Sequence, residues 1–120
     1  MQLKFMALVL LVLGTACSPQ TIESLSVKTE VEDSNQALRA GASFNLVISA
    51  VNSDGLESAE VHIEALDYHQ FFEDLNANRW TISETFEIGP EVKAGEAEIA
   101  VTITAQTGVV TEKSIFIEIE

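Results

Sequence analysis

Ala97-Glu-Ile-Ala-Val-Thr-Ile-Thr-Ala105 is the stretch that decides the fold of this 120-residue chain. Aliphatic side chains occupy every second position from Ala97 to Ala105, and three of the four positions between them are polar. A period of two is typical of a β-strand, because successive side chains of a strand point to opposite faces. The β-branched residues Val101 and Ile103 also favour an extended backbone. The stretch therefore predicts a strand with one face in a core and one in water.

The same alternation recurs along most of the chain. It predicts strands over residues 25–31, 44–50, 59–65, 80–86, 97–105 and 115–119. Turn signals separate several of them, at residues 52–55, 89–90 and 106–108. Short strands at this spacing predict an all-β fold, an antiparallel β-sandwich of the immunoglobulin or fibronectin type. A single cysteine excludes a disulfide between the two sheets, so we expect packing alone to hold the sandwich together.

One segment, residues 67–78, breaks the alternation. Its apolar side chains fall at i, i+3, i+4 and i+7, as Tyr68, Phe71, Phe72 and Leu75. This spacing predicts a short amphipathic helix in the middle loop, with Asp67 as its cap. We expect the aromatic stripe to close one end of the sandwich. The alternative is a patch that binds a partner protein or a glycan, formed by Tyr68, His69, Phe71 and Phe72.

Two places in the sequence offer the chemistry of metal ligands. His62 alternates with Glu60 and Glu64 on one predicted strand face, and imidazole with carboxylates suits zinc or copper. Asn52 and Asp54 carry oxygen atoms of the kind that calcium prefers. A solvated acidic strand and a glycine-containing turn account for the same residues without a metal. We therefore expect no cofactor, and metal binding through Asn52, Asp54 and His62 is the alternative function.

The N-terminus has the pattern of an export signal. Lys4 precedes an apolar run over residues 5–13, and the small residues Gly14-Thr-Ala16 follow. The run is too short to span a bilayer, which takes ~20 residues of helix. We expect cleavage after Ala16, so that residues 1–16 form a signal peptide.

Cys17, directly after this site, resembles the lipobox cysteine of bacterial lipoproteins. The resemblance implies that its sulfur receives a diacylglycerol and that Cys17 becomes the mature N-terminus, with Ser18 directing the protein to the outer membrane. Two or more acyl chains attach a protein stably to a membrane. Residues 17–22 are then the lipidated cysteine and a short tether, and residues 23–120 are one immunoglobulin-like domain. The alternative is a plain secretory signal, which would leave a free thiol.

The net charge and the missing motifs exclude several classes of partner and activity. Removal of Lys4 leaves five basic residues against nineteen acidic ones. Such a surface repels nucleic acid and anionic headgroups, and it favours a soluble monomer. The sequence contains no nucleophile motif and no phosphate-binding glycine loop. We therefore expect a monomer that binds no nucleic acid and is not an enzyme.

The whole layout resembles a family of small Gram-negative lipoproteins with a single immunoglobulin-like domain. The residues that carry the likeness are Ala40-Gly41 before a strand, Asn52-Ser-Asp-Gly-Leu56, Trp80 at the start of a strand, and Gly95. The resemblance implies no catalytic residues. The expected function is a non-catalytic interaction or accessory binding module, lipid-anchored at the cell envelope, with an envelope protein or a glycan as partner. The alternative is a periplasmic β-sandwich protein that binds calcium, zinc or copper.

Overall fold

The computed structural model describes residues 22–31 and 38–120, so the predicted signal peptide and Cys17 lie outside the described residues. The described part is built from strands and one 3-10 turn, η1. The elements are β2 Ser24–Val31, β3 Ser43–Ile63, η1 Glu64–Leu66, β4 Tyr68–Phe72, β5 Ala77–Glu87, β6 Gly95–Ala105 and β7 Val110–Ile119. These strands pair with one another only in antiparallel fashion. The prediction of an all-β, antiparallel fold is confirmed.

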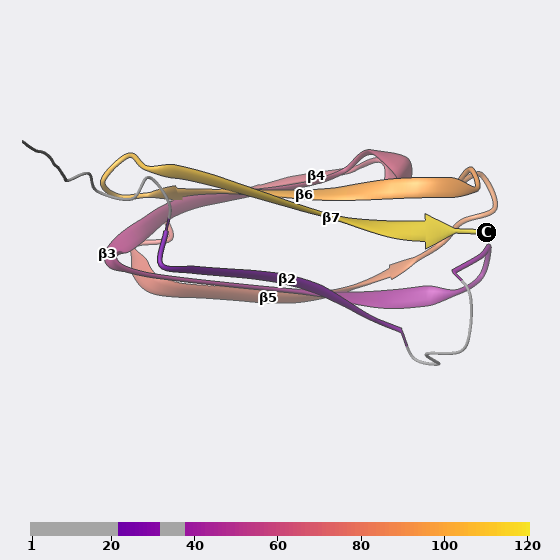
Figure 1. Ribbon diagram of the computed structural model, residues 1–120, viewed down its shortest axis with the longest axis horizontal. Coiled ribbons are helices and arrows are strands. Elements are labelled where there is room, and N and C mark those ends of the chain that lie inside the picture. The colour runs from indigo at the N-terminus through magenta and orange to yellow at the C-terminus, as the bar shows by residue number, and fades with distance from the viewer. Residues whose placement is uncertain (1–21, 32–37) are drawn as a thin grey trace, which may run out of the picture.

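Strand β3 belongs to two layers. Its first part, residues 43–51, pairs with β2 and β5, and its second part, residues 56–63, pairs with β4 and β6. Strand β7 extends the sheet beyond β6. Figure 1 shows β2 and β5 below, β4, β6 and β7 above, and β3 passing between them at the left. We call these the lower layer and the upper layer. Together they make a sandwich-like fold from one curled sheet.

The bend in β3 replaces a predicted turn. The sequence predicts two strands joined at residues 52–55, whereas the structure has one 21-residue strand whose register shifts between Val51 and Leu56. Gly55 takes a φ of 95° at the bend, and its carbonyl accepts a hydrogen bond from the backbone of Gln106. The Asn52 amide also donates to that carbonyl, at 3.3 Å. These bonds satisfy the backbone at the bend, so the chain changes layer without leaving the sheet.

The predicted helix over residues 67–78 is wrong. Residues 68–72 form strand β4, which pairs with the second part of β3, and β5 begins at Ala77. Asp67 instead ends η1 with a φ of 54°, and its backbone N–H donates to the Glu64 carbonyl. Phe71 is exposed while its neighbour Phe72 is half-buried, which is the alternation of a strand. Pairing with β3 outweighs the helical spacing of the aromatic residues.

The core lies between the two layers. Its fully buried side chains come from the alternating positions of β3 and β6, and they include Phe44, Leu46, Ile48, Leu56, Val61, Ile63, Ile99, Val101 and Ile103. Each side chain of this size contributes about 1.5–3 kcal/mol when it is fully buried. Ile22 is buried too, and its N–H donates to Thr111 Oγ1 at 2.9 Å. Ile22 is thus part of the packed core.

Candidate functional site

The side chains of the upper layer that point away from the core form a continuous surface. We call it the outer upper face. It comprises Ser58, Glu60 and His62 of β3, His69 and Phe71 of β4, Glu96, Glu98, Ala100, Thr102 and Thr104 of β6, and Val110, Glu112, Ser114, Phe116 and Glu118 of β7. These positions alternate with the buried ones on the same strands, so the face is a direct product of the period of two.

The largest exposed apolar side chains of the described residues lie on this face. Three large apolar residues of the described chain are largely exposed: Phe71 at 55%, Val110 at 56% and Phe116 at 57%. All three belong to the outer upper face. Phe71 lies across from Glu60, Phe116 across from Glu98, and Val110 across from Thr104. Exposed aromatic side chains that share one face of a sheet make that face a candidate binding surface.

A pair of histidines lies beside Phe71. His62 on β3 and His69 on β4 are directly opposite in the sheet register, and their ring centroids are 4.8 Å apart. The His69 ring is also 5.6 Å from the ring of Phe71. Its Nε2 forms a hydrogen bond with Glu60 Oε2 on the neighbouring strand. Imidazole, phenyl and carboxylate groups therefore meet at one edge of the face.

The outer upper face carries one sign of charge. Its ionisable residues are five glutamates and the two histidines, with no lysine or arginine. Lys113 of β7 turns the other way, and its Nζ donates to the Leu25 carbonyl at 3.1 Å. The face therefore combines apolar anchors with a negative potential.

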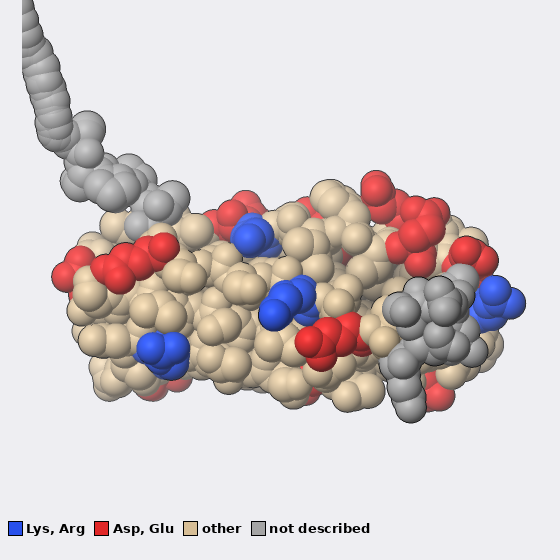
Figure 2. All heavy atoms as spheres, turned by 60° about the horizontal axis from the view of Figure 1, so that its bottom comes forward, with Lys and Arg blue, Asp and Glu red and all other residues tan. Residues whose placement is uncertain are grey.

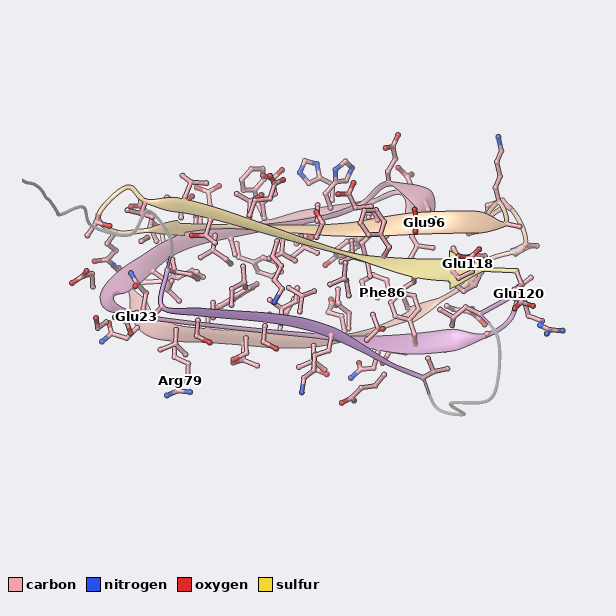
Figure 3. The ribbon with its side chains drawn as sticks, in the orientation of Figure 1. Glu23, Arg79, Phe86, Glu96, Glu118 and Glu120 are labelled. Carbon is pink, nitrogen blue, oxygen red and sulfur yellow. The ribbon has the colours of Figure 1, made fainter. Side chains whose placement is uncertain are left out.

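The opposite surface differs in chemistry. Figure 2, which brings the lower layer forward, shows basic side chains spread over a largely uncharged surface. Arg79 points away from the lower layer there (Figure 3). Hydroxyl and amide groups on this surface bond to one another: Asn45 Nδ2 donates to Ser83 Oγ at 2.9 Å, and Ser49 Oγ lies 3.3 Å from Thr81 Oγ1. Groups that are already paired offer less to a ligand, so we place the candidate site on the outer upper face.

The structure brings only three of the predicted site residues together. His62, His69 and Phe71 lie side by side on the outer upper face. Tyr68 and Phe72 instead turn toward the lower layer. Tyr68 meets Phe86 edge to face at 4.9 Å, and the Phe72 ring lies 5.1 Å from that of Trp80. Figure 3 shows Phe86 in the space between the layers.

The predicted calcium ligands lie elsewhere. Asn52 is buried at the bend of β3, where its amide bonds to the Gly55 carbonyl, and Asp54 is exposed nearby. Neither lies on the outer upper face with His62. Among the residues that the structure describes, no three His, Cys, Asp or Glu side chains are placed to hold a metal ion together.

Sequence reasoning missed Phe116 and Val110 as site residues. The sequence did contain a signal for Phe116. Ile115 and Ile117 occupy the core-facing positions of the alternation, so the pattern places Phe116, between them, on the solvent-facing side. An aromatic residue at a position that the pattern assigns to solvent is a candidate for binding. Val110 lies at the end of β7, where the pattern is too short to assign a face.

The environment of Tyr68 makes a pH-dependent prediction. Burial, and then the charge of Glu84, raise the pKa of the Tyr68 phenol above its ordinary value. The folded state thus favours the protonated phenol. The free energy of unfolding is therefore expected to fall as the pH rises from the ordinary pKa of tyrosine through the raised pKa of Tyr68. Because Tyr68 is the chain's single tyrosine, absorbance near 295 nm should report its ionisation alone. We expect a midpoint above that of the urea-unfolded chain; equal midpoints would contradict the packing described here.

Comparisons with known proteins bear on the fold alone. No protein-family model matches the chain, and no curated protein matches it in sequence. A Niemann-Pick type C2 protein from the Japanese carpenter ant has a similar structure, with a TM-score of 0.51 and 11% identity over 79% of this chain and 89% of that one. Spo0M, a sporulation control protein from Bacillus subtilis, has a TM-score of 0.48 and 12% identity over 82% of this chain and 50% of that one. The first likeness supports a sandwich-like all-β fold.

No helix of the described part is long and apolar enough to cross a membrane.

Proposed function

We propose that this protein is a lipid-anchored, non-catalytic interaction module of the cell envelope that binds a protein partner through its outer upper face. One observation carries the proposal: the exposed large apolar side chains of the described residues, Phe71, Val110 and Phe116, all lie on that face. Buried in an interface, aromatic residues of this kind contribute most of the binding free energy. A partner that covers them would remove the apolar surface that water now contacts.

The anchor part of the proposal rests on the sequence around Cys17 and on the start of the domain. Ile22 is packed in the core and bonded to Thr111, so four residues separate Cys17 from the folded domain. Even fully extended, they would span only about 14 Å. A lipidated Cys17 would therefore hold the domain close to its membrane, and the Ser18 that follows supports the outer membrane as its location.

The strand connections support an immunoglobulin-like type of sandwich. When β3 is counted as two strands, the lower layer contains three strands and the upper layer four. The order is β2–β3–β5 in one and β4–β3–β6–β7 in the other. Two antiparallel layers of this size are typical of that class, whose members commonly act in recognition.

A double substitution tests the binding face. Phe71→Ser with Phe116→Ser removes both aromatic anchors, and both positions are exposed, so the core is left intact. We expect binding to the partner to weaken by tenfold or more, since each hot-spot residue contributes about 2 kcal/mol. The measurement is the size of the complex that contains this protein in gentle detergent extracts of its native membranes. The double variant should run at the size of a single chain.

The matched control is Val47→Ser, which removes an apolar side chain from the outer surface of the lower layer. It should leave the complex at its wild-type size. The proposal fails if the double variant keeps the wild-type complex, or if Val47→Ser disrupts it equally. Disruption of the wild-type complex by glycosidase treatment would point to the glycan alternative instead.

A further inference from the structure

The imidazole rings of His62 and His69 are close enough for both to bind one metal ion. They come from adjacent antiparallel strands in exact register, with ring centroids 4.8 Å apart and an angle of 37° between the ring planes. A bound transition-metal ion lies about 2.0–2.1 Å from each coordinating imidazole nitrogen. Two nitrogens on one ion are thus separated by at most about 4 Å, which rings this close can satisfy. The sheet already fixes the backbones of both histidines, so metal binding costs little additional conformational entropy.

Glu60 orients the His69 ring through a hydrogen bond. Its Oε2 bonds to Nε2 of His69, and an ionised carboxylate can only accept hydrogen bonds. In the tautomer whose Nε2 donates its hydrogen to Glu60, the Nδ1 of His69 keeps its lone pair and can bind a metal. Carboxylates bonded in this way to metal-binding histidines orient the ring and strengthen it as a ligand.

The surroundings of His62 favour a positive charge. The residue opposite His62 on β6 is Ala100, and a hollow of about 350 Å³ opens on that side of His62, away from His69. Three glutamates, Glu64, Glu96 and Glu98, line it. Their negative potential raises the local concentration of cations beside the histidine pair.

We propose that His62 and His69 together bind a divalent transition-metal ion, Zn²⁺ or Cu²⁺, with Glu60 as a positioning residue. Imidazole suits both ions. The protein supplies two ligands and water supplies the others, in keeping with the lack of any group of three metal ligands in the described part of the chain. The metal site does not depend on the proposed partner binding, so an experiment can contradict either proposal and leave the other standing.

Calorimetric titration with each metal salt tests the site. The full chain is used without a histidine tag, in detergent, and with Cys17→Ser in every sample, so that no thiol competes for the ion. We expect one ion per chain. His62→Gln and His69→Gln should each weaken binding by at least about tenfold, because either one removes the chelate. Both residues are exposed, so the fold should survive, and circular dichroism checks this.

Glu112→Gln is the matched control, since it removes one negative charge from the same face on β7, across from Thr102. It should bind as the wild type does, whereas Glu60→Ala should bind about tenfold more weakly. With Cu²⁺, electron paramagnetic resonance should show coupling to two nitrogens in the wild type and to fewer in each histidine variant. The proposal is overturned if the wild type binds neither ion, or if the histidine variants bind as tightly as Glu112→Gln.

Discussion

Replacing Phe44 by alanine is expected to lower the free energy of unfolding by about 3–5 kcal/mol. Phe44 is 1% exposed and stacks on Phe86 at a centroid distance of 5.5 Å. Phe86 in turn supports the Tyr68 ring of the upper layer. The substitution would leave a cavity where the two layers meet, and the neighbouring rings would lose their contacts. Urea unfolding monitored through Trp80 fluorescence measures the change.

Phe116→Ala is the matched control, because it makes the same chemical change at a side chain that is 57% exposed. We expect its effect on stability to stay within about 0.5 kcal/mol. The contrast separates the core from the outer upper face. Equal losses at Phe44 and Phe116 would mean that the layers are not packed as described.

Replacing Cys17 by alanine is expected to abolish membrane attachment. The substitution removes the sulfur that would carry the diacylglycerol, and each buried methylene of an acyl chain contributes about 0.8 kcal/mol to membrane binding. Under the proposed lipidation, two or more chains would be lost, and with them this contribution to membrane binding. Growth with a labelled fatty acid, followed by separation of membrane and soluble fractions, measures both the modification and the location.

Thr15→Ser is a suitable control for this experiment, since it keeps a small residue within the signal and leaves Cys17 in place. It should keep the label and the membrane location. A Cys17→Ala variant that still incorporates the fatty acid would show that the lipid is attached elsewhere. A variant that stays in the membrane without the label would indicate a retained signal peptide.

The strands were predictable because the alternation in this chain is long and regular. Residues 97–105 predict a strand, and β6 runs from Gly95 to Ala105. The turn predicted at residues 106–108 is also confirmed, with Gly108 at a φ of 92°. The bend at Gly55 was not predictable, because the same residues suit a turn between two strands. Hydrogen bonds from Gln106, which is distant in sequence, help to keep that segment within the sheet.

The candidate site was predictable only in part. Phe71 and His69 stood out as residues of an unusual segment, yet their spacing indicated a helix that would have placed Phe71 beside Tyr68. The strand instead separates them onto opposite faces. The pairing of His62 with His69 depends on the register between β3 and β4. Register follows from the η1 turn and from burial, neither of which the spacing of residues reveals.

Photo-crosslinking in intact cells tests the central claim, that the outer upper face is the binding surface. A photoreactive phenylalanine analogue would replace Ser114, midway along β7 on that face, or Ser83, midway along β5 on the lower surface. We predict a discrete protein adduct from position 114 that disappears with Phe71→Ser and Phe116→Ser, and no such adduct from position 83. The same adducts from both positions, or none from position 114, would contradict the account.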